Sequence, residues 1–302
     1  MRFILFFLIL FKITNAIGQT SDYVTRYFTD IRSGRAGDAT LVMKEEKPLV
    51  ILQSTLPYYK DTVSEVRMGA YRLTQLTGII SKEINTRTQA VQYLIQGCAD
   101  NHDGNTDMVI AYLRQFKKTD FGLAAKDSLR SLFEKKSPPS PDLLKLAGYL
   151  EIRELINNIQ PLTQPGNSQS TRWAALLALS RMSDVAALEE LMIRTKRLRV
   201  NDDLVYDIFP DIIYTRQKPA IQYMIEIMRS DSKDCLSADA EREVAIPCGY
   251  RIMEQLAPVI QGYPLKLDVS GDIKTKNYAE ALGTVRSWFD KHPEFMVVND
   301  TY

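Results

Sequence analysis

The chain has 302 residues, with 38 Lys or Arg, 37 Asp or Glu, and a net charge of +1. This balance gives no bulk electrostatic attraction to nucleic acids or anionic membranes, so we expect neither as a partner. Hydrophobic residues make up 45% of the chain, which is ample for a packed core, and 14 glycines with few alternating runs favour an all-helical protein.

Residues 1–18 have the pattern of a secretory signal peptide. Arg2 precedes an apolar run over 3–11, and the small residues Ala16 and Gly18 follow. Cleavage after Gly18 would remove two basic residues and change the charge to 36 − 37 = −1. No stretch approaches eighteen apolar residues, so we expect no stable membrane insertion. The predicted location is the bacterial periplasm or the extracellular medium.

The first half of the chain is predicted to be helical throughout. Residues 19–44 read as a helical cap, and residues 45–136 as helical hairpins that include helices over 63–81 and 84–98. Helices near 106–117 and 120–135 complete this half.

A polar stretch over residues 98–107 is the one candidate metal site. Asp100, Asp103 and Asp107 offer hard oxygen ligands of the kind that calcium prefers. The spacing around Gly104 does not match an EF-hand loop, and Cys98 and His102 lack a second ligand pair for zinc. A turn followed by a helix is the favoured interpretation, and a calcium-stabilised subunit stays open as an alternative.

The second half, residues 137–229, begins with the proline-rich segment 137–141 and shows a 33-residue repeat. Its clearest unit is residues 171–199, two amphipathic helices joined at Ser183 and Asp184, where Asp184 is predicted to cap the second helix. Pro141 suits a helix start, and Pro210 predicts a kink in a helix over 202–215. Four apolar positions recur in three copies: Leu143, Leu176 and Phe209; Leu146, Leu179 and Ile212; Leu155, Leu188 and Ile221; and Ile159, Met192 and Ile225.

Residues 61–73 resemble the inter-helix turn and second helix of a HEAT repeat. The pattern Arg-x-x-Ala begins at Arg67 and recurs at Arg87 and Arg172. The resemblance covers about residues 45–260 and is similar to the short HEAT units of the bilin-lyase type. It implies an all-α fold, an α-solenoid of antiparallel helical hairpins.

The repeat is lost in an insert over residues 230–248. Cys235 and Cys248 lie within it, and in an exported protein we expect them to form a disulfide. Residues 249–302 are predicted as C-terminal helices, over 249–260 and 277–291, that close the array.

The sequence carries no phosphate-binding loop or dinucleotide fingerprint, and its two histidines lie outside any nucleophile motif. We therefore expect a non-catalytic scaffold or adaptor that binds a protein partner and needs no cofactor. The alternative is an enzyme, or a protein that binds a cofactor or glycan, built on the same solenoid. Aromatic and basic residues are the candidate partner contacts: Tyr58, Tyr59, Arg194, Lys196, Arg197, Tyr206 and Tyr214.

Overall fold

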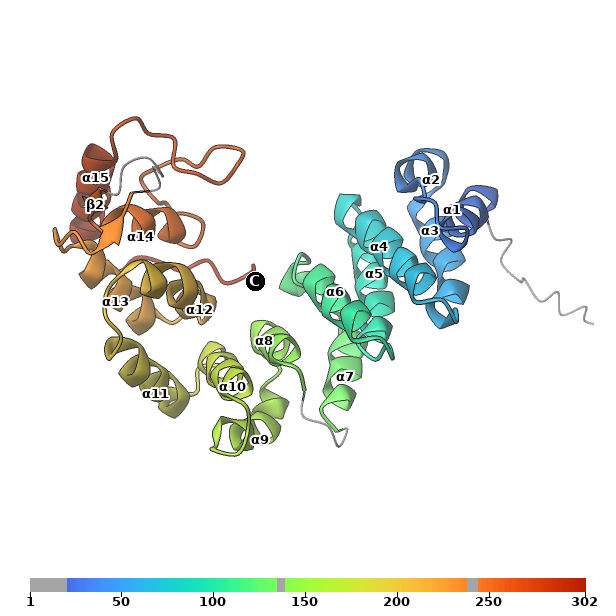
Figure 1. Ribbon diagram of the computed structural model, residues 1–302, viewed down its shortest axis with the longest axis horizontal. Coiled ribbons are helices and arrows are strands. Elements are labelled where there is room, and N and C mark those ends of the chain that lie inside the picture. Colours follow the sequence, from blue (N-terminus) through green and yellow to red (C-terminus); the bar gives the residue numbers. More distant parts are fainter. Residues whose placement is uncertain (1–20, 135–138, 238–243) are drawn as a thin grey trace, which may run out of the picture. The chain divides into compact units, whose positions relative to one another are not determined.

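The computed structural model describes residues 21–134, 139–237 and 244–302 (Figure 1). This part of the chain is mostly helical, as predicted, and its strands form one short hairpin. The predicted signal peptide, 1–18, lies outside the described residues. The α-helices are α1 Asp22–Arg32, α2 Ala39–Glu45, α3 Pro48–Thr55, α4 Ser64–Ile80, α5 Ile84–Gly97, α6 Asp103–Leu113, α7 Leu123–Leu132, α8 Pro141–Tyr149, α9 Ile156–Ile159, α10 Gln169–Arg181, α11 Val185–Lys196, α12 Phe209–Tyr214, α13 Lys218–Met228, α14 Gly249–Leu256 and α15 Tyr278–Lys291.

The chain divides into two compact units, residues 1–90 and 91–302. The division falls inside α5, whereas the strongest break in the sequence is the proline-rich segment 137–141. Among the described residues, none of the helices has the length and apolar character that a membrane span requires.

The first unit packs α1 and α3 against α4. Its core includes the fully buried Phe28, Leu52 and Leu73. Gly69 lets α1 approach closely, because a Cβ at this position would lie 2.5 Å from the Ile31 side chain. The hydroxyl of Tyr27 donates to the Gly69 carbonyl over 3.3 Å, which fixes this helix pair.

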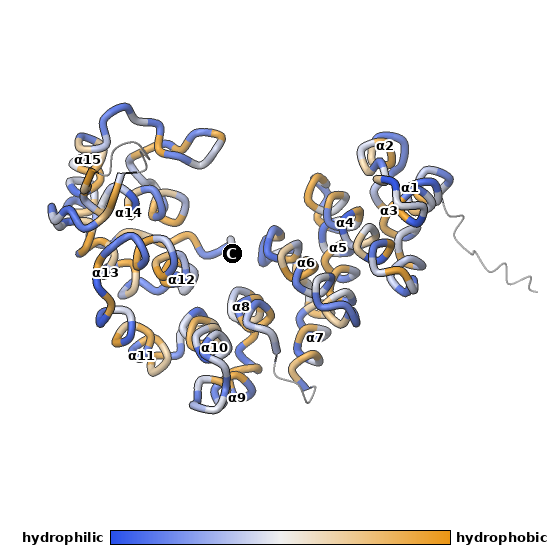
Figure 2. Tube along the Cα trace, viewed as in Figure 1, coloured by the Kyte–Doolittle hydropathy of each residue, from blue (hydrophilic) through white to orange (hydrophobic). Residues whose placement is uncertain are grey.

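In the second unit, each helix packs mainly on those close to it in the chain. Helix α8 lies against α10 and α6, α10 against α11 and α12, and α13 between α12 and α14. Gly148 allows the closest approach, since a Cβ there would lie 2.6 Å from the Ala178 Cα. Figure 2 shows apolar and polar residues alternating along the helices, as expected where one face is buried.

The predicted helix boundaries hold where a cap was identified. Pro141 occupies the first turn of α8, and the Asp184 side chain accepts from the Ala187 amide over 2.9 Å at the start of α11. Pro210 lies near the start of α12, directly after a π-helical turn, η5 Leu204–Ile208. Proline lacks an amide hydrogen, so the regular ladder is interrupted here, and the kink stays a prediction.

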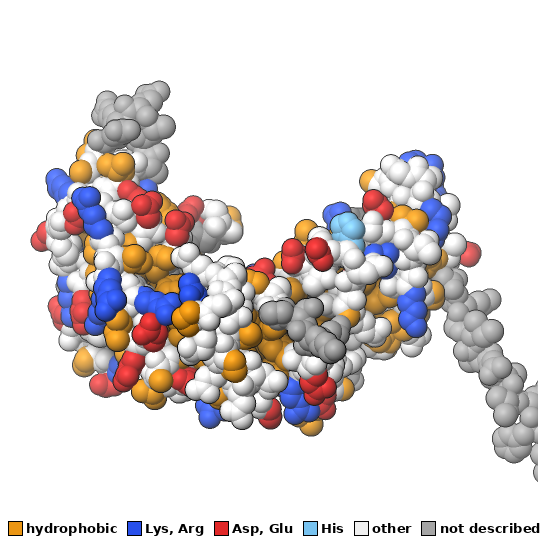
Figure 3. Space-filling model, turned by 60° about the horizontal axis from the view of Figure 1, so that its bottom comes forward, with side chains coloured by type: hydrophobic (Ala, Val, Ile, Leu, Met, Phe, Trp, Pro, Cys, Tyr) orange, Lys and Arg blue, Asp and Glu red, His pale blue; other side chains and the backbone are white. Residues whose placement is uncertain are grey.

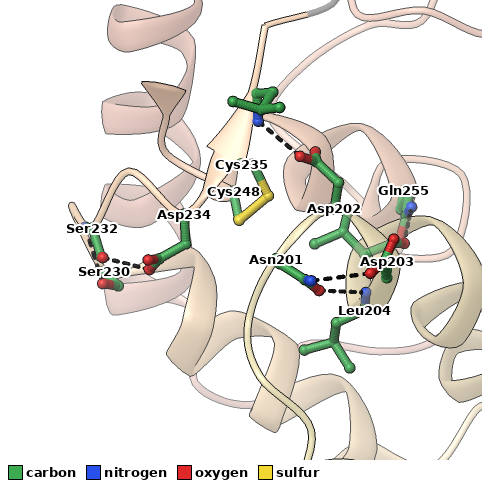
Figure 4. The surroundings of a disulfide bond; sticks show 12 residues. Asn201, Asp202, Asp203, Leu204, Ser230, Ser232, Asp234, Cys235, Cys248 and Gln255 are labelled. Atoms are coloured by element: carbon green, nitrogen blue, oxygen red, sulfur yellow. Dashed lines mark hydrogen bonds between the residues drawn. A yellow bond between two sulfur atoms is a disulfide. The ribbon is translucent and has the colours of Figure 1, made fainter. Parts of the chain in front are cut away.

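The predicted disulfide between Cys235 and Cys248 is present and closes the insert. Beside it, β1 Cys235–Leu236 pairs antiparallel with β2 Ala245–Ile246. The Leu236 amide donates to Asp202 over 2.9 Å, at the start of the helix that contains η5 (Figure 4). The insert is therefore attached to the irregular helical turn as well as closed on itself.

Candidate functional site

The last residues of the chain leave α15 and return across the second unit (Figure 1). The Gln261 amide donates to the Met296 carbonyl over 3.0 Å, and the Val298 amide donates to the Val259 carbonyl over 2.8 Å. These bonds set the direction in which residues 299–302 cross toward α12, α10 and α8.

All four backbone carbonyls of residues 299–302 accept hydrogen bonds from side chains. Arg181 Nη2 donates to the carbonyls of Asn299 at 3.3 Å and Thr301 at 3.0 Å. The Tyr149 hydroxyl donates to Asp300, and Arg216 Nη2 donates to Tyr302, each over 3.0 Å. We call the surrounding residues the cradle: Arg114, Lys118, Tyr149, Glu151, Arg181, Tyr214 and Arg216.

Side chains of the segment also contact the cradle. Asn299 Nδ2 donates to Glu151 over 3.0 Å. The ring centroid of Tyr302 lies 5.4 Å from that of Tyr149 and 5.3 Å from that of Tyr214, with the Arg114 guanidinium carbon 4.7 Å from it. Such aromatic and cation–π contacts each contribute about 0.5–1.5 kcal/mol beyond the buried area.

Arg181, the last residue of α10, is the centre of the cradle. It is only 2% exposed, and its Nη1 donates to the Tyr214 carbonyl. Its guanidinium also lies over the rings of Tyr149, at 5.6 Å, and Tyr214, at 5.3 Å. Burial lowers the pKa of Arg181, while Tyr214 opposes that change. An arginine keeps its proton at neutral pH, so the cradle holds a buried cation that needs acceptors.

Three helices of this unit end at residues with left-handed backbone conformations. Glu151 follows α8 by two residues with φ 51°, Ser183 follows α10 with φ 67°, and Arg216 follows α12 with φ 54°. Such conformations cost about 1–3 kcal/mol in residues other than glycine. Two of these three residues bond to residues 299–302, so the turns direct their side chains into the cradle.

Asp211 on α12 links the helices that carry cradle residues. Its carboxylate accepts from Lys145 Nζ on α8 and from Trp173 Nε1 on α10, each over 2.6 Å. The hydroxyl of Tyr214, the last residue of α12, donates to the Lys145 carbonyl on α8. Three helices are thereby held in one arrangement around the segment.

Burial shapes the titration of the other cradle groups. It raises the pKa of Tyr149 to about 12 and that of Tyr214 well above its usual range. Burial lowers the pKa of Lys118. Burial alone would raise the pKa of Glu151, but hydrogen bonds from Lys118, at 2.7 Å, and Asn299 outweigh it and lower the pKa. At neutral pH the cradle thus contains protonated tyrosines, cations and one carboxylate.

Two of the pockets in this unit adjoin α10 or α12. One of about 460 Å³ adjoins Tyr302 and is lined by cradle and α12 residues, including Asp211 and Arg216. The other, of about 690 Å³, is largely apolar and is lined by Trp173, Arg194, Leu198, Ile208 and the start of α10. On the face that Figure 3 draws, acidic and basic side chains are intermingled.

The predicted partner contacts are divided between the two units. In the first unit, the Tyr58 ring stacks on Phe28 at 3.6 Å, and Tyr59 is buried with its hydroxyl bonded to Thr74 over 2.8 Å. These two tyrosines pack within that unit because their rings complete its core, so Tyr59 is not a surface contact.

The remaining predicted contacts lie in the second unit. Arg194 pairs with Glu190 over 2.7 Å and lines the larger pocket, and the Lys196 ammonium lies 5.4 Å from the Tyr223 ring. Arg197 is exposed, and Tyr206 is 51% exposed. Only Tyr214, which is buried, belongs to the cradle.

The polar stretch over 98–107 forms a turn that leads into α6. Asp100 accepts from the His102 amide over 2.9 Å and from Asn105 Nδ2 over 3.2 Å, while Asp103 and Asp107 are exposed on the helix. Within residues 21–134, 139–237 and 244–302, no three His, Cys, Asp or Glu side chains gather as metal ligands would.

Sequence reasoning missed Arg114, Tyr149, Arg181, Arg216 and residues 299–302. One signal in the sequence pointed to Arg181: Gly148, Arg181 and Tyr214 share a position in the 33-residue alignment, and Arg181 is the charged residue among them.

Comparison of the chain with protein-family models, with characterised proteins and with solved structures finds no match. A functional assignment therefore rests on the residues of this chain.

Proposed function

We propose that this protein is an exported, non-catalytic scaffold that binds a short non-helical segment of a partner protein in the cradle. One observation carries the proposal: four consecutive carbonyls of residues 299–302 are bonded by side chains of the cradle, which receives a short non-helical backbone segment as a binding site would. Side-chain donors aimed at backbone acceptors are typical of peptide recognition.

The scaffold in this proposal is an α-solenoid of HEAT-like hairpins. Contacts between residues 33 apart support it, because stacked repeats place equivalent positions side by side. Tyr149 bonds to the Phe116 carbonyl, Lys118 to Glu151, and Arg181 to the Tyr214 carbonyl, each across this interval. Of the twelve apolar positions aligned in the sequence, all are buried except Leu188 and Met192, which are half-buried.

The resemblance to HEAT repeats gains support from the arginines. Arg67 Nη1 donates to the carbonyls of Asp61 and Thr62, at 2.8 and 3.4 Å. Arg87 Nη1 makes the same contacts with Ser81 and Lys82, at 3.2 and 2.9 Å. Each arginine therefore fixes the turn that precedes its own helix.

Two further features favour export and binding. The Cys235–Cys248 disulfide is compatible with an oxidising compartment. The tyrosines and arginines of the cradle retain their protons at neutral pH, which suits hydrogen bonding better than proton transfer.

Affinity capture of partners from the envelope and secreted fractions of the source tests the proposal, with residues 19–302 as bait. We compare the unaltered bait with Arg216→Glu in the cradle and with Arg229→Glu, a matched charge reversal at the residue that follows α13, whose partner is Asp290. We expect a protein that is captured by the unaltered bait and by Arg229→Glu and is lost with Arg216→Glu.

A third bait carries Glu at Arg194, Lys196 and Arg197. If this bait alone loses the partner, the binding surface lies on α11 and the cradle proposal is wrong. Circular dichroism of each bait shows whether its helices are intact.

A further inference from the structure

We infer that the cradle selects its partner segment by one aromatic side chain, a phenylalanine in the place of Tyr302, and that residues 299–302 compete with that segment. The inference rests on the proposed function and specifies both the partner and its regulation. It follows from which contacts depend on side-chain identity.

The backbone contacts carry little sequence information. Arg181, Tyr149 and Arg216 donate to carbonyls that every residue possesses. Of the segment's side chains, Thr301 makes one long contact, from Arg216 at 3.4 Å, and Asn299 bonds at an exposed position. The cradle therefore distinguishes one segment from another mainly by the residue at the position of Tyr302, whose ring contacts Tyr149, Tyr214 and Arg114.

The site for the Tyr302 ring suits an aromatic residue without a hydroxyl. Tyr149, Tyr214 and Arg114 surround the ring, and cations and aromatic edges both favour a π face. The Tyr302 hydroxyl is buried and has no hydrogen-bond partner among the described residues. A buried hydroxyl without a partner weakens binding, and phenylalanine does not carry this penalty.

The same donors that hold residues 299–302 would hold the partner. Arg181 Nη2 already bridges two carbonyls of this segment, so both segments cannot occupy the cradle at once. The apparent affinity for a partner is then reduced by the fraction of molecules whose cradle is occupied. Because the competing segment is tethered, its effective concentration is high.

Fluorescence anisotropy with labelled hexapeptides tests both parts. The peptides have the sequence of residues 297–302, Val-Val-Asn-Asp-Thr-Tyr, or replace its last residue with Phe or Ala. The protein is the mature chain, residues 19–302, carrying Tyr302→Ala to release its own segment. We expect the Phe peptide to bind about five- to thirtyfold more tightly than the Tyr peptide. The Ala peptide should bind at least about thirtyfold more weakly than the Phe peptide.

The unaltered mature chain should bind each peptide at least about tenfold more weakly than Tyr302→Ala does. A second releasing variant, Asn299→Asp, places a carboxylate against Glu151 and leaves the enclosed ring intact. It should also bind the peptides more tightly than the unaltered chain, even if Tyr302→Ala disturbs folding.

Paired substitutions in the Tyr302→Ala background locate the site. Tyr149→Phe removes the hydroxyl that bonds to the Asp300 carbonyl and to the Phe116 carbonyl, and should weaken all three peptides about fivefold. Tyr278→Phe also removes a tyrosine hydroxyl, the one that bonds to Glu254 on α14, and should leave peptide binding unchanged.

Equal binding of the Phe and Tyr peptides would overturn the selectivity, and equal binding by the unaltered and released proteins would overturn the competition. If no peptide binds either folded variant, the whole inference falls. The proposed function is judged separately, by whether Arg216→Glu abolishes capture of a partner protein.

Discussion

The two compact units use buried arginine and tyrosine in different ways. In residues 21–90, Arg67 bonds to the turn before its own helix, and Tyr27 and Tyr59 bond to neighbouring helices of the same unit. In residues 91–302, Arg181 bonds to carbonyls 118 and 120 residues away. The same residue types thus stabilise a turn in one unit and hold a segment that is distant in sequence in the other. Burial alone does not distinguish these roles, but the sequence distance to the acceptor does.

The largest expected effect is on the free energy of unfolding, and it should be larger for a substitution of Arg181 than for one of Arg67. Arg181→Met leaves the Tyr214 carbonyl and two segment carbonyls without their donor, which should lower the free energy of unfolding by about 3–5 kcal/mol. Arg67→Met should cost less, about 1–3 kcal/mol, because the Asp61 and Thr62 carbonyls to which Arg67 donates lie in a turn close to solvent.

Both tryptophans of the chain, Trp173 and Trp288, lie in the second unit, so urea unfolding can be followed for that unit by fluorescence. Arg181→Met should move the fluorescence transition to lower urea. Arg67→Met should move the circular dichroism transition and leave the fluorescence transition in place. A shift of the fluorescence midpoint by Arg67→Met would show that the two units unfold together and would contradict the distinction.

The disulfide should have the next largest effect, again confined to the second unit. Replacing Cys235 and Cys248 by serine releases a loop closed across 13 residues, which costs about 3 kcal/mol in the chain-entropy model. The fluorescence transition should fall, and adding reductant to the unaltered protein should reproduce the change. If reductant also destabilises the double variant, its effect does not come from this bond.

A smaller effect tests the left-handed turns. Glycine adopts positive φ without strain, so Ser183→Gly should raise the stability of the second unit by about 0.5–1 kcal/mol. Glu151→Gly relieves a similar backbone strain but removes the acceptor of Lys118 and Asn299. We therefore expect little net gain from it, together with tighter binding of the hexapeptides because the segment is released. Equal stabilisation by both substitutions would show that Glu151 does not hold the segment.

Local rules of sequence predicted most of the fold. Asp184 caps α11 and Pro141 begins α8 because capping and proline geometry depend only on neighbouring residues. The disulfide was predictable because its cysteines are close in the chain and few others are available. The hairpin of β1 and β2 was missed, since strands of two residues are too short to show alternation.

The cradle was not predictable from such rules. Its hydrogen bonds to the carbonyls of residues 299–302 join residues 86–151 positions apart, and no periodic pattern connects Tyr149 or Arg181 with residues 299–302. Choosing aromatic and basic residues by type found Tyr214 but also selected Tyr59, whose ring completes the core of the other unit. Residue type indicates what a side chain can contact, whereas the fold decides which segment it meets.

The smallest expected effect is the pH dependence of the segment's attachment. The folded pKa of Glu151 lies below its ordinary value of 4.5, because Lys118 and Asn299 bond to the carboxylate and outweigh the effect of burial. As the pH falls below 4.5, the unfolded chain takes up this proton first, so the stability that Glu151 contributes is present above that pH and is lost as the pH approaches the folded pKa.

Glu151→Gln has no carboxylate to titrate and should lose less stability over the same interval. Fluorescence melting of both proteins between about pH 6 and pH 3.5 measures the difference. Other carboxylates titrate in both proteins and cancel in the comparison. Parallel curves would mean that the Lys118–Glu151–Asn299 contact does not contribute to folding, so that the hydrogen bonds from Tyr149, Arg181 and Arg216 hold residues 299–302 without it.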